Sequence, residues 1–256
     1  MKGLILAAGM GARLMPLTTD RPKALMNIGG TTLLGRIIDQ CAEVGMDEVI
    51  VVTGYRSDTL GSWLDRTPSE IPVRTVFNSE FETTNNAHSV FVARDAIGKS
   101  DFIKMDGDLV LDTGILRHLV QDSLPSVAVI DLGAARDIEA MKAKISDTGQ
   151  ILAFGKWLEI DEAQGESIGV EKIGAADADL LFESIERVVY REGRTDACYE
   201  DVYHVMLEEH GWQMGSIGVE GRLWSEVDNA TDLEYARSCH KILQSGKEAS
   251  QSQHRG

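Results

Sequence analysis

Two glycines and two cations follow the first apolar segment of the sequence. Gly9 and Gly11 end the run Lys2 to Ala8, and Arg13 and Lys23 come after them. Backbone N–H groups of a glycine-rich loop can wrap phosphate oxygens, and the two side chains can neutralise their charge. The spacing matches neither a Walker A loop nor Gly-x-Gly-x-x-Gly, so for the glycines alone the alternative is a turn with two surface cations. The longer pattern Gly-x-Gly-x-Arg-x-x-Pro-Leu-Thr-x-x-x-Pro-Lys favours phosphate binding.

Carboxylates are spaced for a metal ion in two further segments. Asp106 and Asp108 come directly after the apolar run Asp101 to Met105. Two carboxylates at i and i+2 beyond the end of a strand suit a hard cation such as Mg²⁺, and the alternative is an Asp-Gly turn. Asp228 ends the segment Trp-Ser-Glu-Val-Asp, where it could equally be the N-cap of a helix over Thr231 to Leu243.

Several other polar residues, considered without their neighbours, can be explained by ordinary structural roles. Asn85 and Asn86 precede an apolar helical pattern and could cap it. Lys156 follows the run Ile-Leu-Ala-Phe-Gly, which is typical of a strand. Glu200 and Asp201 form an acidic first turn of a predicted helix, as the helix dipole favours.

Together these segments resemble the signature of the sugar-1-phosphate nucleotidyltransferase superfamily. The glycine loop, the Asp-Gly-Asp motif and the Trp-x-Glu-Val-Asp segment occur in the family's order over residues 3 to 243. The resemblance is greatest to the branch that uses phosphocholine or 2-aminoethylphosphonate. It implies an enzyme that joins an NTP, here CTP, to a small phosphorylated or phosphonate acceptor. The acceptor oxygen attacks the α-phosphorus in line and pyrophosphate leaves, so no protein nucleophile is needed.

The resemblance also implies a role for each candidate site residue. The implied nucleotide-binding residues are Ala8, Gly9, Gly11, Arg13, Lys23, Asn86, Ser89 and Asp106. The implied acceptor-binding residues are Asn85, Lys156, Glu166, Glu200 and Asp201. The implied cofactor is Mg²⁺, with Asp108 and Asp228 as its ligands, and the implied catalytic cations are Arg13, Lys23 and Lys156.

Strands and helices alternate in the first half of the chain. Buried strands are predicted at Lys2 to Ala8 and Glu48 to Thr53, further strands at Val73 to Phe77 and Asp101 to Met105, and helices at Thr31 to Val44, Ser57 to Asp65 and Asn86 to Ile97. This order predicts an α/β fold with a doubly wound, mostly parallel, Rossmann-like sheet. Ligands of such sheets bind beyond the carboxyl ends of the strands, where the candidate residues lie.

In the second half of the chain, strands and helices no longer alternate regularly. It predicts strands at Val127 to Leu132, Ala140 to Ile145, Ile151 to Phe154, Glu166 to Ile173, Gln213 to Val219 and Leu223 to Val227, and helices at Ala176 to Tyr190, Tyr199 to His210 and Thr231 to Leu243. Residues 146–149 are expected to form a hairpin turn. We expect an inserted mixed β substrate lobe, a single nucleotidyltransferase domain over 1–243 and a flexible tail over 244–256.

Composition excludes several classes of partner. The chain has 256 residues and a net charge of -16, which disfavours binding to nucleic acid. No apolar run approaches the ~20 residues that span a bilayer, so we expect no membrane partner. Three cysteines without Cys-x-x-Cys spacing, and no secretory signal, indicate the cytoplasm. Small-molecule substrates, the NTP and the phospho-acceptor, are the partners that the resemblance implies. The oligomeric state stays open, a homodimer included.

The sequence is compatible with more than one acceptor and with two alternative functions. A sugar 1-phosphate nucleotidyltransferase with another base is one alternative, and a non-catalytic nucleotide-binding subunit is another. Glu200, Asp201 and Tyr199 at one helix start, with Trp157 and Trp224 near other site segments, would suit a positively charged head group. We therefore expect CTP and a cationic phospho-acceptor.

Overall fold

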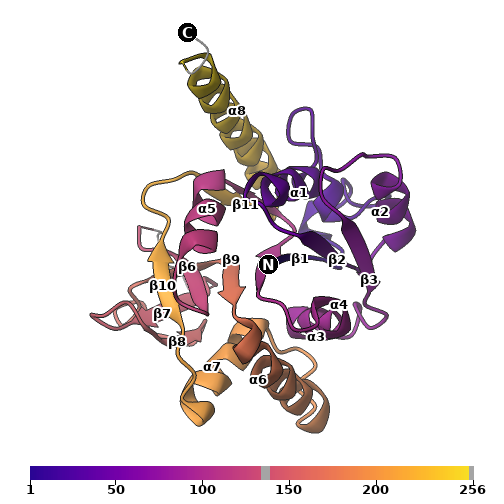
Figure 1. Cartoon of the computed structure of the whole chain (residues 1–256). Coiled ribbons are helices and arrows are strands. Elements are labelled where there is room, and N and C mark those ends of the chain that lie inside the picture. The colour runs from indigo at the N-terminus through magenta and orange to yellow at the C-terminus, as the bar shows by residue number, and fades with distance from the viewer. Residues whose placement is uncertain (134–138, 254–256) are drawn as a thin grey trace.

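The computed structural model describes residues 1–133 and 139–253, with side chains described to residue 246 (Figure 1). A central sheet runs through the molecule in the strand order β10-β6-β9-β4-β1-β2-β3. The strands in this order along the chain are β1 (Lys2–Ala7), β2 (Glu48–Thr53), β3 (Val73–Phe77), β4 (Phe102–Asp106), β6 (Val127–Asp131), β9 (Gly165–Ile173) and β10 (Gly215–Gly218).

In the parallel half of the sheet, β1, β2 and β4 are mostly buried, as their apolar residues predict, whereas the edge strand β3 is largely exposed. Strands β1 to β4 pair in parallel, in the order β4-β1-β2-β3. Alternate residues of β2 enter two separate cores: Val49 and Val51 pack on one side, Ile50 and Val52 on the other. The first core is closed by helices α1 (Leu33–Glu43), α2 (Ser57–Leu64) and α5 (Thr113–Gln121), and the second by α3 (Asn86–Val92), α4 (Arg94–Ile97), α6 (Ala175–Ile185) and α7 (Tyr199–His210). The predicted α/β fold class is confirmed.

Strand β9 makes the sheet mixed. It lies between β4 and β6 and is antiparallel to both. It also pairs with β7 (Lys142–Ile145), which forms a hairpin with β8 (Ile151–Gly155) around Gly149 at φ +79°. This hairpin corresponds to the predicted lobe, and the turn lies where the sequence indicated.

Some elements differ from those expected. The predicted helix Asn86 to Ile97 is two helices, α3 and α4, and α6 ends in a π-helical segment over Glu186–Arg191. The short strand β5 (Leu109–Leu111) and helix α5 were not anticipated. Strand β5 pairs in antiparallel fashion with β11 (Trp224–Glu226), outside the main sheet.

Helix α8 (Ala230–Gln253) is longer than expected and projects beyond the body of the fold (Figure 1). We expected it to end at Leu243, but it continues through most of the predicted tail, whose residues 254–256 lie outside the described part of the chain. Residues 244–253 have low apolar content yet lack proline, so no residue in them forces the helix to stop.

Candidate active site

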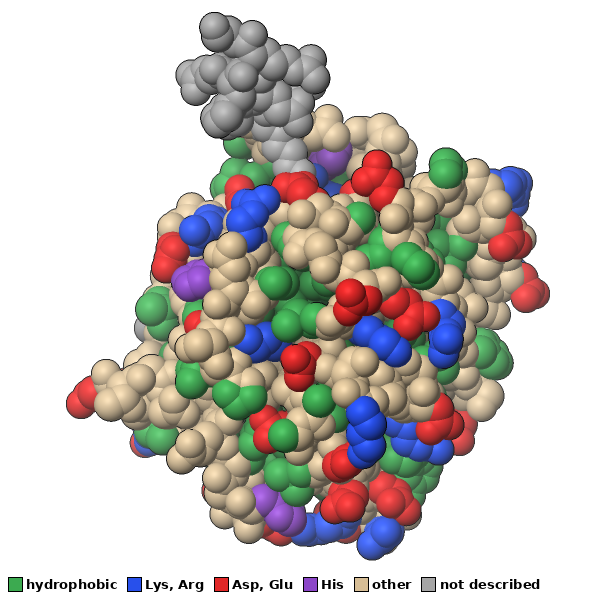
Figure 2. Space-filling view, viewed as in Figure 1, with side chains coloured by type: hydrophobic (Ala, Val, Ile, Leu, Met, Phe, Trp, Pro, Cys, Tyr) green, Lys and Arg blue, Asp and Glu red, His purple; other side chains and the backbone are tan. Residues whose placement is uncertain are grey.

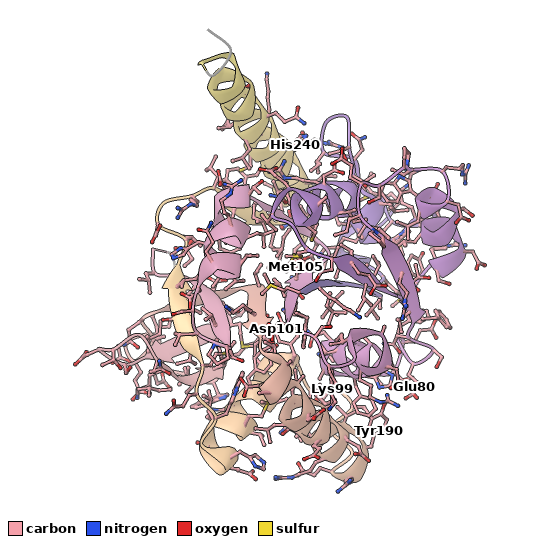
Figure 3. The ribbon with its side chains drawn as sticks, in the orientation of Figure 1. Glu80, Lys99, Asp101, Met105, Tyr190 and His240 are labelled. Carbon is pink, nitrogen blue, oxygen red and sulfur yellow. The ribbon has the colours of Figure 1, made fainter. Side chains whose placement is uncertain are left out.

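A cleft of about 460 Å³ opens at the carboxyl ends of β1 and β4. Met105, buried in β4, marks the strand that leads into it (Figure 3). Among its lining residues are Ala8, Gly9, Gly11, Arg13, Lys23, Asn85, Asn86, Ser89, Asp106, Asp108 and Asp228. The fold therefore brings together every residue to which the sequence assigned nucleotide or metal binding, and one acceptor residue, Asn85.

The glycine loop wraps the mouth of this cleft. Gly11 has φ +61°, a conformation that favours glycine, and a Cβ there would lie 3.0 Å from Cβ of Lys23. The hydroxyl of Thr18, which is fully buried, donates to the carbonyl of Gly11 at 3.0 Å. Glycine at this position therefore lets the loop fold back against the segment that carries Lys23.

The two predicted cations pair with the two predicted metal ligands. Nζ of Lys23 lies 2.7 Å from Oδ2 of Asp108 and 2.8 Å from Oδ1 of Asp228, and the Arg13 guanidinium lies 2.9 Å from Oδ2 of Asp228. Burial opposes the charge of Lys23, but these carboxylates raise the pKa of its ammonium group. A triphosphate in the cleft would compete with the carboxylates for both cations.

A third carboxylate, Glu226, completes this cluster. Carboxylate oxygens of Asp108, Glu226 and Asp228 all lie within 4.8 Å of one another. Antiparallel pairing of β5 with β11 brings them together, because Glu226 lies opposite Leu109 and the N–H of Val227 donates to the carbonyl of Asp108 at 3.1 Å. We assigned Glu226 no role from the sequence, although its i, i+2 spacing from Asp228 repeats that of Asp106 and Asp108.

The cluster fits a hard divalent cation. Oδ1 of Asp108 is buried and has no hydrogen-bond partner among the described residues, which is costly for a carboxylate. Burial raises the pKa of Asp108, and burial together with the charges of Asp108 and Asp228 raises the pKa of Glu226 to about 8. A cation with oxygen ligands, such as Mg²⁺, would relieve this excess of negative charge.

The start of α8 is capped by neighbours of Asp228 and not by Asp228 itself. Oδ1 of Asn229 accepts from the N–H groups of Thr231 and Asp232, at 2.8 and 3.1 Å. Oδ2 of Asp232 accepts in return from the N–H groups of Asp228 and Asn229. The carboxylate of Asp228 is thus left to the cations, and the capping alternative for Asp228 is wrong.

The opposite wall of the cleft comes from α3. Asn85 does cap this helix, since its Oδ1 accepts from the N–H of Asn86 at 2.8 Å. Ser89 accepts at 3.1 Å from Nδ2 of Asn78, a buried residue after β3 that also lines the cleft and that the sequence did not single out. Asn78 and Ser89 therefore form a hydrogen-bonded polar pair in the wall of the cleft that the glycine loop also lines.

Four predicted acceptor residues do not line this cleft. Lys156 is half exposed and pairs with Glu139 at 3.4 Å, and Glu166 lies on β9. Glu200 is buried, and burial with the nearby carboxylates raises the pKa of Glu200 to about 8, although Lys104 opposes this. Oδ2 of Asp201 accepts from the N–H of Cys198 at 2.9 Å, so it caps the start of α7.

Replacing Asp201 by Ala is expected to lower the free energy of unfolding by about 1 kcal/mol, because the N–H of Cys198 loses its acceptor. Urea unfolding of Asp201→Ala, beside an exposed control such as Asp179→Ala, measures the loss. A rise in the acceptor's KM with unchanged stability would instead place Asp201 at the acceptor.

Acidic and basic side chains alternate over the viewed face, with no broad basic patch there (Figure 2). In the part of the chain that the structure describes, no helix combines the length and apolar character needed to cross a bilayer.

Comparisons with known proteins point to one family. A family model described as nucleotidyl transferase matches residues 2–133. A CTP:phosphoglutamine cytidylyltransferase of Campylobacter jejuni is 27% identical over an alignment of 252 positions that covers 91% of this chain and 98% of the relative. A 2-aminoethylphosphonate cytidylyltransferase of Lancefieldella rimae is 24% identical over 230 residues, 90% of this chain and 89% of that protein. The structure of a CTP:phosphocholine cytidylyltransferase from Streptococcus pneumoniae has a similar fold, with a TM-score of 0.72 at 21% identity, over 93% of this chain and 97% of that one.

Proposed function

The chain belongs to the nucleotidyl transferase family, and from that premise we propose that it transfers a cytidylyl group from CTP to a small phosphorylated or phosphonate acceptor. Pyrophosphate is the second product. The observation that carries the proposal is the pairing of Lys23 with both Asp108 and Asp228 beside the glycine loop. Cations for a triphosphate and carboxylates for a metal ion lie in one cleft, as nucleotidyl transfer needs.

The reaction follows from this arrangement without a protein nucleophile. An oxygen of the acceptor's phosphate or phosphonate attacks the α-phosphorus, a new P–O–P bond forms, and the bond to the β-phosphate breaks in line. Lys23 and Arg13 neutralise the pyrophosphate as it leaves, and the N–H groups near Gly9 and Gly11 hold its oxygens. A divalent cation, when bound to Asp108, Glu226 and Asp228, supplies charge neutralisation at the phosphate oxygens.

The choice of CTP and of a cationic acceptor is supported by two facts. The Campylobacter jejuni and Lancefieldella rimae relatives are both named as cytidylyltransferases, and the second is named for 2-aminoethylphosphonate. Near Asp106, burial raises the pKa of Glu171 to about 7 and that of Glu200 to about 8, although Lys104 opposes this. A positively charged ligand nearby would stabilise the charged forms of both carboxylates. Lys156, which follows β8 of the hairpin, and Glu166, on β9 opposite Lys142 of β7, are our candidates for contacts with the acceptor's other groups.

We further propose that the enzyme works in the cytoplasm on small molecules alone. Cys41, Cys198 and Cys239 are free thiols, which suits a reducing compartment. Mg²⁺ is the metal that we propose for the carboxylate cluster.

Pyrophosphate release across the four common NTPs tests the substrates. Each NTP is paired in turn with phosphocholine, 2-aminoethylphosphonate, phosphoglutamine and glucose 1-phosphate, with acceptor-free reactions as controls. We expect turnover with CTP and an amine-bearing acceptor. Fast turnover of glucose 1-phosphate with another base would establish the sugar alternative, and nucleotide binding without turnover would establish a regulatory subunit.

A further inference from the structure

Tyr199, the first residue of α7, contacts two cleft residues from behind. Its side chain is 1% exposed, and it does not itself line the cleft. Its backbone N–H donates to Oδ1 of Asn86 at 2.9 Å, and its hydroxyl donates to Oδ2 of Asp106 at 2.8 Å. One residue outside the cleft thus joins the α3 wall to the end of β4.

Lys104 fixes the ring of this tyrosine. Its Nζ lies 3.3 Å from the centroid of the Tyr199 ring, 2.7 Å from Oε2 of Glu171 and 3.4 Å from Oδ1 of Asp106. Lys104 and Glu171 are both fully buried and lie directly opposite each other on β4 and β9. A buried cation over an aromatic face is strongly attracted to it, so the ring has little freedom to turn.

The backbone of β9 closes the remaining side of Asp106. Gly169 has φ +76°, and a Cβ at this position would lie 2.4 Å from Oδ2 of Asp106. The Asp106 carboxylate is thus bounded by Tyr199, Lys104 and Gly169, with its other side toward the cleft. Gly107 and then Asp108, a candidate metal ligand, follow Asp106 directly in the sequence.

Core packing alone does not account for the Tyr199 hydrogen bond. Tyr203, on the same helix, is also fully buried and packs against Tyr199, Phe154 and Trp212. Its hydroxyl has no hydrogen-bond partner in the described part of the chain. This core therefore tolerates a buried tyrosine hydroxyl without a partner, and the contact from Tyr199 to Asp106 needs another reason.

We propose that Tyr199 is a positioning residue for nucleotide binding. It holds the side chains of Asn86 and Asp106 in the orientation in which they contact the nucleotide. The inference rests on the proposed function, since it takes the cleft to be the CTP site. Tyr199 acts only through these two side chains. Removal of its hydroxyl leaves the ring, the contact with Lys104 and the packing of α7 in place.

Tyr199→Phe tests the proposal, with Tyr203→Phe as the matched control on the same helix. We expect Tyr199→Phe to raise the KM and the dissociation constant for CTP about 10-fold to 100-fold, as for the loss of a hydrogen bond to a charged group. The acceptor's KM should not change, and Tyr203→Phe should match the wild-type enzyme. A purely structural defect would lower the apparent kcat, because a smaller fraction of the protein would be folded, and it would leave both KM values unchanged.

A double-mutant cycle with Asp106→Ala shows whether Tyr199 acts through Asp106. In that background, we expect Tyr199→Phe to weaken CTP binding by less than it does in the wild-type protein. Equal CTP binding by Tyr199→Phe and Tyr203→Phe, or full additivity in the cycle, overturns the inference while the proposed function stands. A wild-type protein that binds CTP but releases no pyrophosphate with any acceptor contradicts the proposed function alone, because the binding cycle still reports on Tyr199. A wild-type protein that binds no CTP contradicts both.

Discussion

Replacement of Asp108 or Asp228 by Asn is expected to lower turnover at least about 100-fold, with the fold intact. Each change removes one of three carboxylates that lie within 4.8 Å of one another, and with it the charge that would hold a divalent cation against the phosphates. Asn keeps the size of the side chain, so the pairing of β5 with β11 has no reason to change. Pyrophosphate release at saturating Mg²⁺ measures the effect.

Asp95→Asn makes the same chemical change at an exposed side chain of α4, outside the cleft, and serves as the control. Circular dichroism and unfolding midpoints of all three variants establish that they are folded. Turnover near the wild-type rate in both Asp108→Asn and Asp228→Asn, with Mg²⁺ saturating, would refute the metal assignment.

Lys23→Met is expected to lower kcat/KM for the NTP at least about 100-fold without a change in the order of preferred acceptors. The ammonium of Lys23 is the group best placed to neutralise the triphosphate, and Met preserves much of the packing against Gly11. Assays with CTP against two acceptors, with exposed Lys99→Met as the control, measure both quantities.

The same variant should bind Mn²⁺ or Mg²⁺ more tightly in the absence of nucleotide. In the structure the Lys23 ammonium lies 2.7 Å from Asp108 and 2.8 Å from Asp228, so it competes with a divalent cation for these oxygens. Titration of the nucleotide-free proteins with Mn²⁺ measures the difference. A change in acceptor preference would show that Lys23 belongs to the acceptor side, and unaltered NTP kinetics would show that the loop does not hold the triphosphate.

Local patterns in the sequence were sufficient for the parallel half of the fold. Strands such as Glu48–Thr53 are continuous apolar runs separated by amphipathic helices, and each strand can be recognised from its own residues. The carboxyl ends of parallel strands share one edge, so Gly11 and Asp108 could be placed at one site before the structure was known. Lys23 follows the loop closely enough to be included with it.

The antiparallel contacts could not be predicted in this way. Strand β9 mixes apolar residues with Glu166, Glu171 and Lys172, and nothing in its residues shows that it inserts in antiparallel fashion between β4 and β6. The pairing of β5 with β11 depends on three residues from each strand. Such short segments carry little periodic signal, and a pairing between distant segments is set by the packing of the whole chain.

The sequence by itself determined the fold class, the family resemblance and the residue types at the cleft. Only the tertiary structure decided which of these residues touch. It placed Glu226 beside Asp108 and Asp228, gave the capping of α8 to Asn229, and put Tyr199 behind Asp106. The physical reason is that hydrogen bonds and ion pairs act over about 3 Å, so they depend on strand register and helix position that no local pattern specifies.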